Sequence, residues 1–189
     1  MFTLYSADFT GNPGNCSYPH KTVVMNTDNL REAVCHDYVC AEYKNHYRNG
    51  ENFISADCLP VDCDNDHSED PKDWVTPADV LEAFPGVSIA IHYSRFNNRE
   101  KNGKPARPKF HVLFPIDRMT DATLYSDMKK LVNSIFPYFD TKALDAARFF
   151  FGTASADVEL FPGSMNLTEF LENDDFDADL PGGHHASLV

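Results

Sequence analysis

The segment 54–64 most constrains the fold, because it reads as a strand that ends in two acids separated by one residue. Side chains two apart on a strand point to the same face, which places the carboxylates of Asp62 and Asp64 about 6–7 Å apart and turns Cys63 the other way. Two like charges held this close favour a cation between them. Mg²⁺ and Mn²⁺ bind carboxylate oxygens and leave further positions for substrate phosphates. The segment therefore predicts either a phosphoryl-transfer centre or an ordinary solvated acidic turn.

The overall charge disfavours a protein that coats nucleic acid electrostatically. The chain has 189 residues, of which 16 are basic and 29 acidic, so its net charge is −13. Such a charge still permits an enzyme that binds nucleic acid locally. With 42% hydrophobic residues the chain can bury a core. We expect a catalytic domain over 1–170, with an N-terminal module at about 1–50 and a motif-bearing core at 53–153, and then an acidic, disordered tail over 171–189.

The sequence shows neither a secretion signal nor an apolar run of membrane-spanning length, so we expect a cytoplasmic protein with no membrane partner. The five cysteines are then expected to be reduced. Four residues separate Cys35 from Cys40, and four separate Cys58 from Cys63. Because this is not the usual short zinc-binding spacing, we favour buried small hydrophobic residues over a zinc site.

Hydrophobic periodicity predicts the elements around the acidic strand. Further strands are expected at 2–6, 21–25, 87–93, 110–114, 138–140 and 148–152. Helices are expected at 27–41, 77–84 and 120–136, with a helical turn at 143–147 and little regular structure after 157. The order of these elements indicates an α+β fold, in which an antiparallel or mixed sheet carries helices on one face.

A basic cluster precedes the strand at 110–114. Lys109 and His111 are again two residues apart and share a face, and Arg107 comes just before them. Two cations and an imidazole beside an acidic metal site suit a polyphosphate, because they supply charge and hydrogen-bond donors. Arg107 and Lys104 are also candidates for contacts with template or primer phosphates. The alternative interpretation is a basic hairpin loop with a half-buried histidine.

A third cluster consists of Asp140, after two aromatic residues, and Arg148, eight residues later. With a third carboxylate, the acids can hold two ions roughly 3.5–4 Å apart, an arrangement that polymerises nucleotides. Asp145 is an alternative third ligand. It is also a candidate ion-pair partner of Arg148, which is the interpretation that we favour.

The order of these three clusters resembles the three motifs of the archaeo-eukaryotic primase (AEP) superfamily, in the primase-polymerase branch of phages, plasmids and mobile elements. The resemblance covers about 53–153 and extends weakly to the first fifty residues. It implies that Asp62 and Asp64 of the first motif and Asp140 of the third are metal ligands. It also implies that His111 contacts the nucleotide and that Arg148 is the basic residue facing the triphosphate. The family usually has serine two residues before the histidine, where this chain has Lys109, which we interpret as an added phosphate contact.

The resemblance also implies a fold, an activity and partners. The expected fold is a small α/β module joined to an RRM-like sheet, with the active site between them. The expected activity is nucleotidyl transfer by a primase or DNA polymerase, which adds dNTPs or NTPs to a primer or an initiating nucleotide on single-stranded DNA with two Mg²⁺ or Mn²⁺ ions. Related proteins join this domain to a helical primase domain and a helicase, so these are expected partners on a longer chain.

Two other functions remain open at this point. The first is a catalytically inactive RRM-like module that stacks bases on exposed Tyr93, Phe96 and Phe110, although the acidic charge disfavours it. The second is a calcium loop, in which the acids at 62, 64 and 66 match the first three ligand positions. That interpretation is weakened because His67 stands where glycine is expected and Asp73 where a bidentate glutamate is usual.

Overall fold

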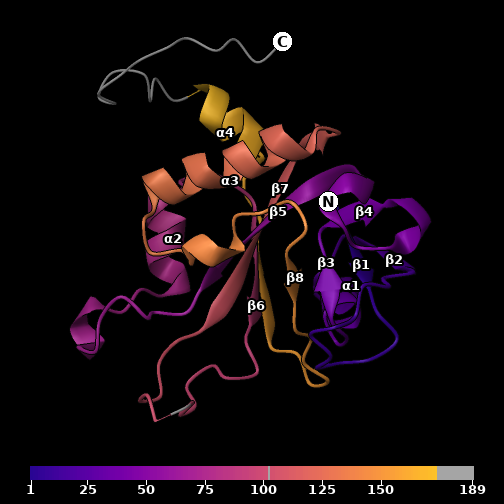
Figure 1. Ribbon diagram of the computed structural model, residues 1–189. Helices are drawn as coiled ribbons and strands as arrows, with labels where there is room; N and C mark the ends of the chain where they lie inside the picture. The colour runs from indigo at the N-terminus through magenta and orange to yellow at the C-terminus, as the bar shows by residue number, and fades with distance from the viewer. Residues whose placement is uncertain (102, 174–189) are drawn as a thin grey trace.

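The computed structural model describes residues 1–101 and 103–173. Within these residues two antiparallel sheets form the frame of the molecule (Figure 1). One sheet has the order β2-β1-β3-β8 and consists of β1 (Phe2–Ser6), β2 (His20–Val24), β3 (Tyr38–Val39) and β8 (Phe149–Phe150). The other has the order β4-β5-β7-β6-β9 and consists of β4 (Ala41–Tyr43), β5 (Phe53–Cys63), β6 (Ile89–Tyr93), β7 (Phe110–Met119) and β9 (Val158–Phe161).

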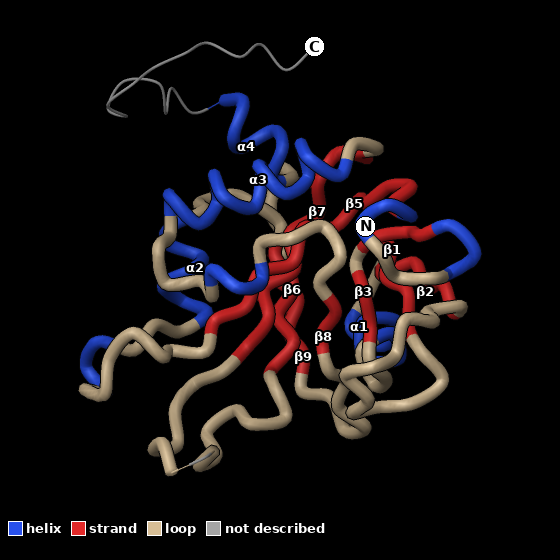
Figure 2. The backbone as a smooth tube through the Cα atoms, viewed as in Figure 1, coloured by secondary structure: helices blue, strands red, loops and turns tan. Residues whose placement is uncertain are grey.

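The helices are α1 (Thr27–Ala33), α2 (Pro77–Ala83), α3 (Ala122–Ile135) and α4 (Leu167–Asn173). Figure 2 shows α2, α3 and α4 together on one side of the five-stranded sheet, while α1 accompanies the other sheet. α3 packs on β5 and β7, and α4 packs on β7. The predicted α+β class is confirmed. None of the described helices is long and apolar enough to cross a membrane.

Local sequence explains where two of the helices begin. The Asn26 side chain accepts a hydrogen bond from the backbone N–H of Asn29 at 2.9 Å and caps α1. Thr76 and Asp79 form a capping box around the first turn of α2, and Pro77 occupies the first helical position. Both helices therefore begin where the local sequence supplies a cap.

Strand β5 separates two hydrophobic cores. Val61 and Cys63 belong to the core beneath the helices, whereas Cys58 belongs to the core shared with β1 and α1. Asp62 is four residues from Cys58 on the same strand, so both side chains point to the same side, toward the four-stranded sheet. In the register of the sheet Asp62 lies opposite His111 on β7. The acid is thereby placed between the two sheets, which is the location that the AEP resemblance implies for an active site.

The predicted helix over 27–41 is too long. α1 ends at Ala33, and a turn follows in which the carboxylate of Asp37 accepts hydrogen bonds from the backbone N–H groups of Gly11, Asn12 and Gly152 at 2.8–3.0 Å. A fully buried carboxylate that caps three N–H groups favours a turn over a continued helix. Residues 38–43 then form strands rather than helix.

The apolar face of α3 lies only partly in the core. Leu124 and Leu131 are 45% and 37% exposed, whereas Lys129 is 1% exposed. The helix packs through Tyr125, Met128 and Val132, and the Lys129 ammonium donates to the carbonyl of Asp145 at 2.8 Å and lies over the Tyr125 ring. A carbonyl on the loop after α3 therefore accepts a hydrogen bond from the buried ammonium of Lys129. Hydrophobic periodicity cannot predict where that loop lies.

Three further predictions are corrected at the C-terminal side. Residues 138–140 form a loop rather than a strand, and the helical turn lies at Thr141–Ala143 rather than 143–147. Regular structure continues after 157, because β9 adds to the edge of the sheet beside β6 and α4 buries Leu167 and Phe170. The expected tail over 171–189 overlaps the end of α4, and its remainder lies outside the described residues.

Candidate active site

Three carboxylates meet at the end of β5. Asp62 is the penultimate residue of the strand, Asp64 follows it, and Asp140 lies on the loop after α3. The backbone N–H of Asp140 donates to the carbonyl of Asp62 at 2.7 Å, which ties this loop to the strand. One oxygen of each carboxylate lies within 4.8 Å of one oxygen of each of the others. Asp145 is absent from this cluster of described residues, and its carboxylate instead accepts from the N–H of Ala147 at 2.8 Å.

The electrostatics of this acidic cluster fit a divalent cation. Burial, and next the charge of Asp64, raise the pKa of Asp62 to about 7, although Arg148 opposes the shift. The ionised carboxyl is therefore costly here unless a positive charge joins it. Three closely spaced carboxylates offer only oxygen acceptors, the donor set that Mg²⁺ and Mn²⁺ bind.

Three basic side chains surround the acids. The Lys109 ammonium, 5% exposed, lies 2.8 Å from an oxygen of Asp64. His111 Nε2 lies 3.8 Å from one oxygen of Asp62, and the Arg148 guanidinium lies 3.9 Å from the other. The structure thus brings together the residues that the sequence predicts, but it pairs Arg148 with Asp62 rather than with Asp145.

Arg107 does not join this group, contrary to its predicted role in nucleotide binding. Its side chain is fully buried and donates to the carbonyl of Asn65 at 2.8 Å and to the carboxylate of Glu69 at 3.0 Å. Trp74 covers its guanidinium, whose carbon lies 5.4 Å from the ring centroid. Arg107 therefore holds the loop after β5 in place and presents no surface to a nucleotide. Lys104, the other candidate for phosphate contacts, is ion-paired with Asp66 at 3.3 Å.

Two residues that the sequence analysis missed support His111. Tyr38 Oη lies 3.0 Å from Nδ1 of His92 and 3.1 Å from Nδ1 of His111, and the two Nδ1 atoms are 3.2 Å apart. Burial lowers the pKa of both histidines, so both are neutral near pH 7. Because Nδ1 of His111 lies within this cluster, its Nε2 is the ring nitrogen that faces Asp62, at 3.8 Å. The available sequence signal was His92 in a predicted strand, but the register that sets it opposite His111 is a tertiary property.

This support for His111 gives a prediction about stability. We expect Tyr38→Phe to lower the free energy of unfolding by about 1–3 kcal/mol, because buried imidazole nitrogens lose a partner. Urea unfolding at pH 7.5 measures the change. The control Tyr47→Phe removes a hydroxyl from a side chain that is 52% exposed and should change it by less than about 0.5 kcal/mol. Equal stabilities of the two variants would contradict the supporting role of Tyr38.

The other interpretations of the sequence fare less well in the described part of the chain. All five cysteines are free thiols, and Cys40, Cys58 and Cys63 are buried, as expected for small hydrophobic residues. Phe110 is fully buried in the core, so it cannot stack bases. Asp66 pairs with lysines instead of joining Asp62 and Asp64, which disfavours the calcium loop.

Comparisons with known proteins agree with this fold. No family model matches the sequence, and no curated protein matches it significantly. Among solved structures, the AEP domain of the primase-polymerase (PrimPol) of cyanophage S-2L is similar, with a TM-score of 0.50 over 90% of this chain and 88% of that chain. The two sequences are 11% identical, so the likeness is one of fold. The chain therefore has an AEP-like α+β fold, with the acidic cluster between its two sheets.

Proposed function

We propose that this protein is a DNA-directed primase-polymerase that transfers nucleotides from dNTPs or NTPs onto a primer or an initiating nucleotide. The observation that carries the proposal is the convergence of Asp62, Asp64 and Asp140 within 4.8 Å in an AEP-like fold. These residues come from segments about 75 positions apart, and the raised pKa of Asp62 leaves the cluster in need of a cation. An acidic turn on a protein surface has neither property.

The acids would hold one or two Mg²⁺ or Mn²⁺ ions. When bound, such ions lower the pKa of an attacking 3′-hydroxyl and stabilise the charge of departing pyrophosphate. The carboxylates of Asp62, Asp64 and Asp140 bind the cation and fix its place at the end of β5. The backbone bond from Asp140 to Asp62 keeps the third carboxylate in position.

The neighbouring basic side chains would orient the triphosphate. Nε2 of His111 lies 3.8 Å from one oxygen of Asp62, and the Arg148 guanidinium lies 3.9 Å from the other. The charge of Arg148 and a hydrogen bond from neutral His111 would stabilise negative charge on the leaving group. Lys109 is paired with Asp64 and reduces repulsion within the acidic cluster, and we assign it a further contact with phosphate.

Arg148 provides a test of nucleotide binding. We expect Arg148→Gln to raise KM for the nucleotide by about tenfold, because one charged phosphate contact is lost. Arg31→Gln serves as the matched control, since this half-exposed arginine on α1 pairs only with exposed Asp28 among the described acids. Steady-state incorporation kinetics measure both variants. An unchanged KM in Arg148→Gln would remove this residue from the proposed site.

Metal binding should depend on pH. Because the pKa of Asp62 is about 7, its carboxyl is mostly protonated at pH 6 and mostly ionised at pH 8, and a metal ion must displace the proton. We expect Mn²⁺ to bind about tenfold more tightly at pH 8 than at pH 6 in calorimetric titrations. The Asp62→Asn variant should lose this dependence. Equal affinities of the wild-type protein at the two pH values would count against a cation at Asp62.

The activity itself is tested by incorporation of labelled dNTPs and NTPs on a primed single-stranded DNA template. We expect extension with Mn²⁺ or Mg²⁺, none with EDTA, and none from an Asp62→Asn/Asp64→Asn variant that still folds. The relative rates of incorporation of dNTPs and NTPs then show whether the product is DNA or RNA. The same reaction on a template without a primer tests whether the protein can initiate synthesis. A folded wild-type chain that binds Mn²⁺ and nucleotide but transfers none would contradict the proposed activity.

A further inference from the structure

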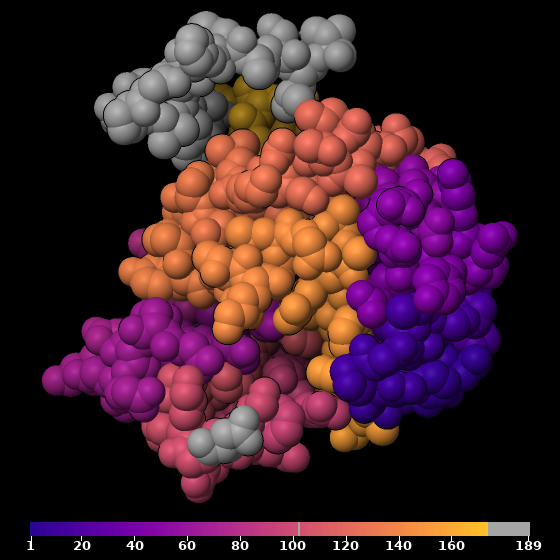
Figure 3. All heavy atoms as spheres, viewed as in Figure 1, coloured from indigo at the N-terminus to yellow at the C-terminus, as the bar shows by residue number. Residues whose placement is uncertain are grey.

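A row of alternating cations and aromatic rings lies on the surface beside the acidic cluster. We call it the cation–aromatic row, and it consists of Arg48, Phe149, Phe151, Arg95, Phe96 and Lys101. All six side chains are partly exposed. They come from three segments, namely the loop before β5, strand β8 with the residue after it, and the loop between β6 and β7. Figure 3 shows that parts of this last loop and of the segment around residues 140–150 are exposed on one face of the molecule.

The contacts along the row are continuous. The Arg48 guanidinium carbon lies 4.8 Å from the centroid of the Phe149 ring, which meets Phe151 edge-on at 5.1 Å. The Arg95 guanidinium carbon lies 4.4 Å from the Phe151 ring and 5.3 Å from the Phe96 ring. The Lys101 ammonium lies 4.6 Å from Phe96 and completes the row. Cation–π contacts of this kind hold the positive groups beside the rings without neutralising them.

The row adjoins the acidic cluster across the segment 148–151. Alternation along β8 directs Phe150 and Arg148 inward, where Phe150 contacts the ring of His111 at 4.6 Å and Arg148 reaches Asp62 at 3.9 Å. Phe149 and Phe151 have the opposite parity and point away from the acids. A strand therefore separates the proposed catalytic residues from the row, and one short segment positions both.

The cations of the row are not neutralised. Among the described residues, no carboxylate lies within 4.0 Å of the charged groups of Arg48, Arg95 or Lys101. By contrast, Lys104 and Lys109 of the same β6–β7 loop region are paired with Asp66 and Asp64. Arg48 donates to the carbonyls of Ala147 and Asn15 at 3.0 Å and 3.2 Å, which anchors that end of the row. In a chain of net charge −13, Arg95 and Lys101, which have no carboxylate partner among the described residues, indicate a binding surface for an anionic partner.

We propose that the cation–aromatic row binds single-stranded nucleic acid, and specifically the unpaired template strand as it approaches the acidic cluster. This inference rests on the proposed function. Aromatic rings stack on bases of any sequence while neighbouring cations follow the phosphates, the combination that binds single strands without sequence preference. Arg95 between Phe96 and Phe151 supplies both kinds of contact at one place.

The test measures binding of a fluorescein-labelled oligodeoxythymidine strand by anisotropy, in EDTA and without nucleotide. We expect Arg95→Gln/Lys101→Gln to weaken binding and to reduce the slope of log K against log salt by about 1.4, because each lost phosphate contact removes about 0.7. We expect Phe96→Ala to weaken binding about tenfold and to leave the slope unchanged, because stacking releases no counterions. Circular dichroism and thermal unfolding establish that each variant is folded.

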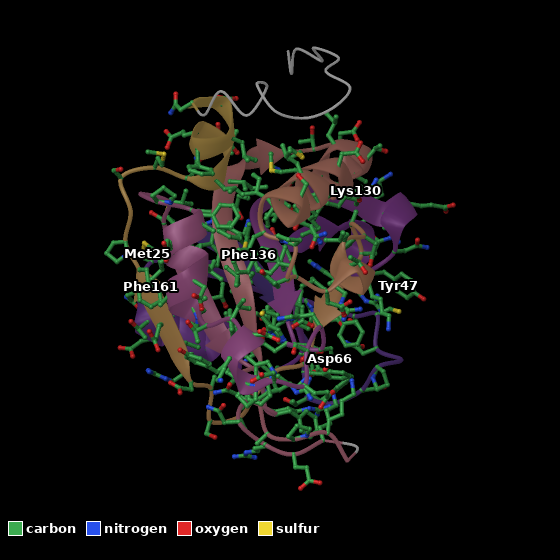
Figure 4. The ribbon with its side chains drawn as sticks, turned by 90° about the vertical axis from the view of Figure 1, so that its left-hand side faces the viewer. Met25, Tyr47, Asp66, Lys130, Phe136 and Phe161 are labelled. Atoms are coloured by element: carbon green, nitrogen blue, oxygen red, sulfur yellow. The ribbon has the colours of Figure 1, made fainter. Side chains whose placement is uncertain are left out.

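A control with the same loss of charge is Arg31→Gln/Lys130→Gln. Lys130 lies on α3, well away from Asp66 (Figure 4), and pairs with Asp127 at 2.6 Å. The control should bind the strand as the wild-type protein does. An unchanged Kd in Arg95→Gln/Lys101→Gln, an equal loss in the control, or no binding by the wild-type chain would each overturn the inference.

The outcomes separate this inference from the proposed function. Asp62→Asn/Asp64→Asn should bind the oligonucleotide at least as tightly as the wild-type protein, since it keeps the row and loses two negative charges. Wild-type binding through the row without nucleotide incorporation would refute the activity alone. Incorporation by a wild-type protein whose row variants bind the strand normally would refute the row alone.

Discussion

Asp62→Asn should lower metal-dependent nucleotide incorporation by about 10³-fold or more, because it removes a ligand that the structure places among three carboxylates. Asparagine keeps the shape of the side chain but cannot supply the negative charge. The metal-free variant should also be at least as stable as the wild-type protein at pH 8. The native pKa of Asp62, about 7, lies above that of an unfolded aspartate, which is about 3.9. The native state therefore loses stability as the pH rises from the unfolded pKa to the native pKa, and Asn at this position avoids that loss.

Asp66→Asn is the matched control for this substitution. Asp66 lies four residues from Asp62 and pairs with Lys104 at 3.3 Å and with Lys109 at 3.6 Å, but it stands outside the acidic cluster. We expect the incorporation rate of Asp66→Asn to stay within about threefold of the wild-type rate, since half-exposed Asp66 supplies no ligand to the proposed cation and Lys109 keeps its closer partner Asp64. Single-turnover extension of a labelled primer measures both variants. A folded Asp62→Asn protein that extends primers as fast as Asp66→Asn would refute the assignment of Asp62 as a ligand.

Gly152→Ala should lower the free energy of unfolding by about 3 kcal/mol or more, the largest effect on stability that we expect from a single methyl group. A Cβ atom at this position would meet the carbonyl oxygen of His36, and that oxygen belongs to rigid backbone. The N–H of Gly152 also donates to buried Asp37 at 3.0 Å, so the backbone there cannot easily shift. Because β8 ends two residues before Gly152, we expect displacement of Arg148 and a loss of incorporation as well.

Gly50→Ala is the control, because a Cβ atom there meets nothing within 4 Å. Its stability should change by less than about 0.5 kcal/mol. Urea unfolding followed by circular dichroism measures both variants. Wild-type stability of Gly152→Ala would show that β8 and the turn after α1 are not packed as closely as the structure indicates.

Local signals predicted the acidic strand and its neighbours well. β5 and its partner β7 begin where apolar alternation places them, and the spacing of Asp62 and Asp64 follows from strand geometry alone. Asp140 was also identified, although its backbone forms a loop rather than the expected strand. The role of Asp140 depends on where its loop lies relative to β5. The hydrogen bond from the backbone N–H of Asp140 to the carbonyl of Asp62 fixes that position, although residues 138–140 do not form a strand.

The remaining features depend on contacts between distant segments. Arg107 carries the same sequence signal as Lys109, and only the partners of the two side chains distinguish them. Arg107 is covered by Trp74 and bonded to Asn65 and Glu69, whereas Lys109 reaches Asp64 in the acidic cluster. The pairing of Tyr38 with His92 and His111 joins three strands whose register no single sequence reveals. Local patterns therefore located the acids, whereas the residues that orient them required the structure.

The most direct test of the central claim is the anomalous diffraction of Mn²⁺ in crystals grown with a non-hydrolysable dNTP. The account predicts Mn²⁺ peaks in contact with carboxylate oxygens of Asp62, Asp64 and Asp140, and a triphosphate within hydrogen-bond distance of His111 and Arg148. Manganese bound elsewhere, or a nucleotide bound away from these residues, would contradict the proposal that this acidic cluster is a centre of nucleotidyl transfer.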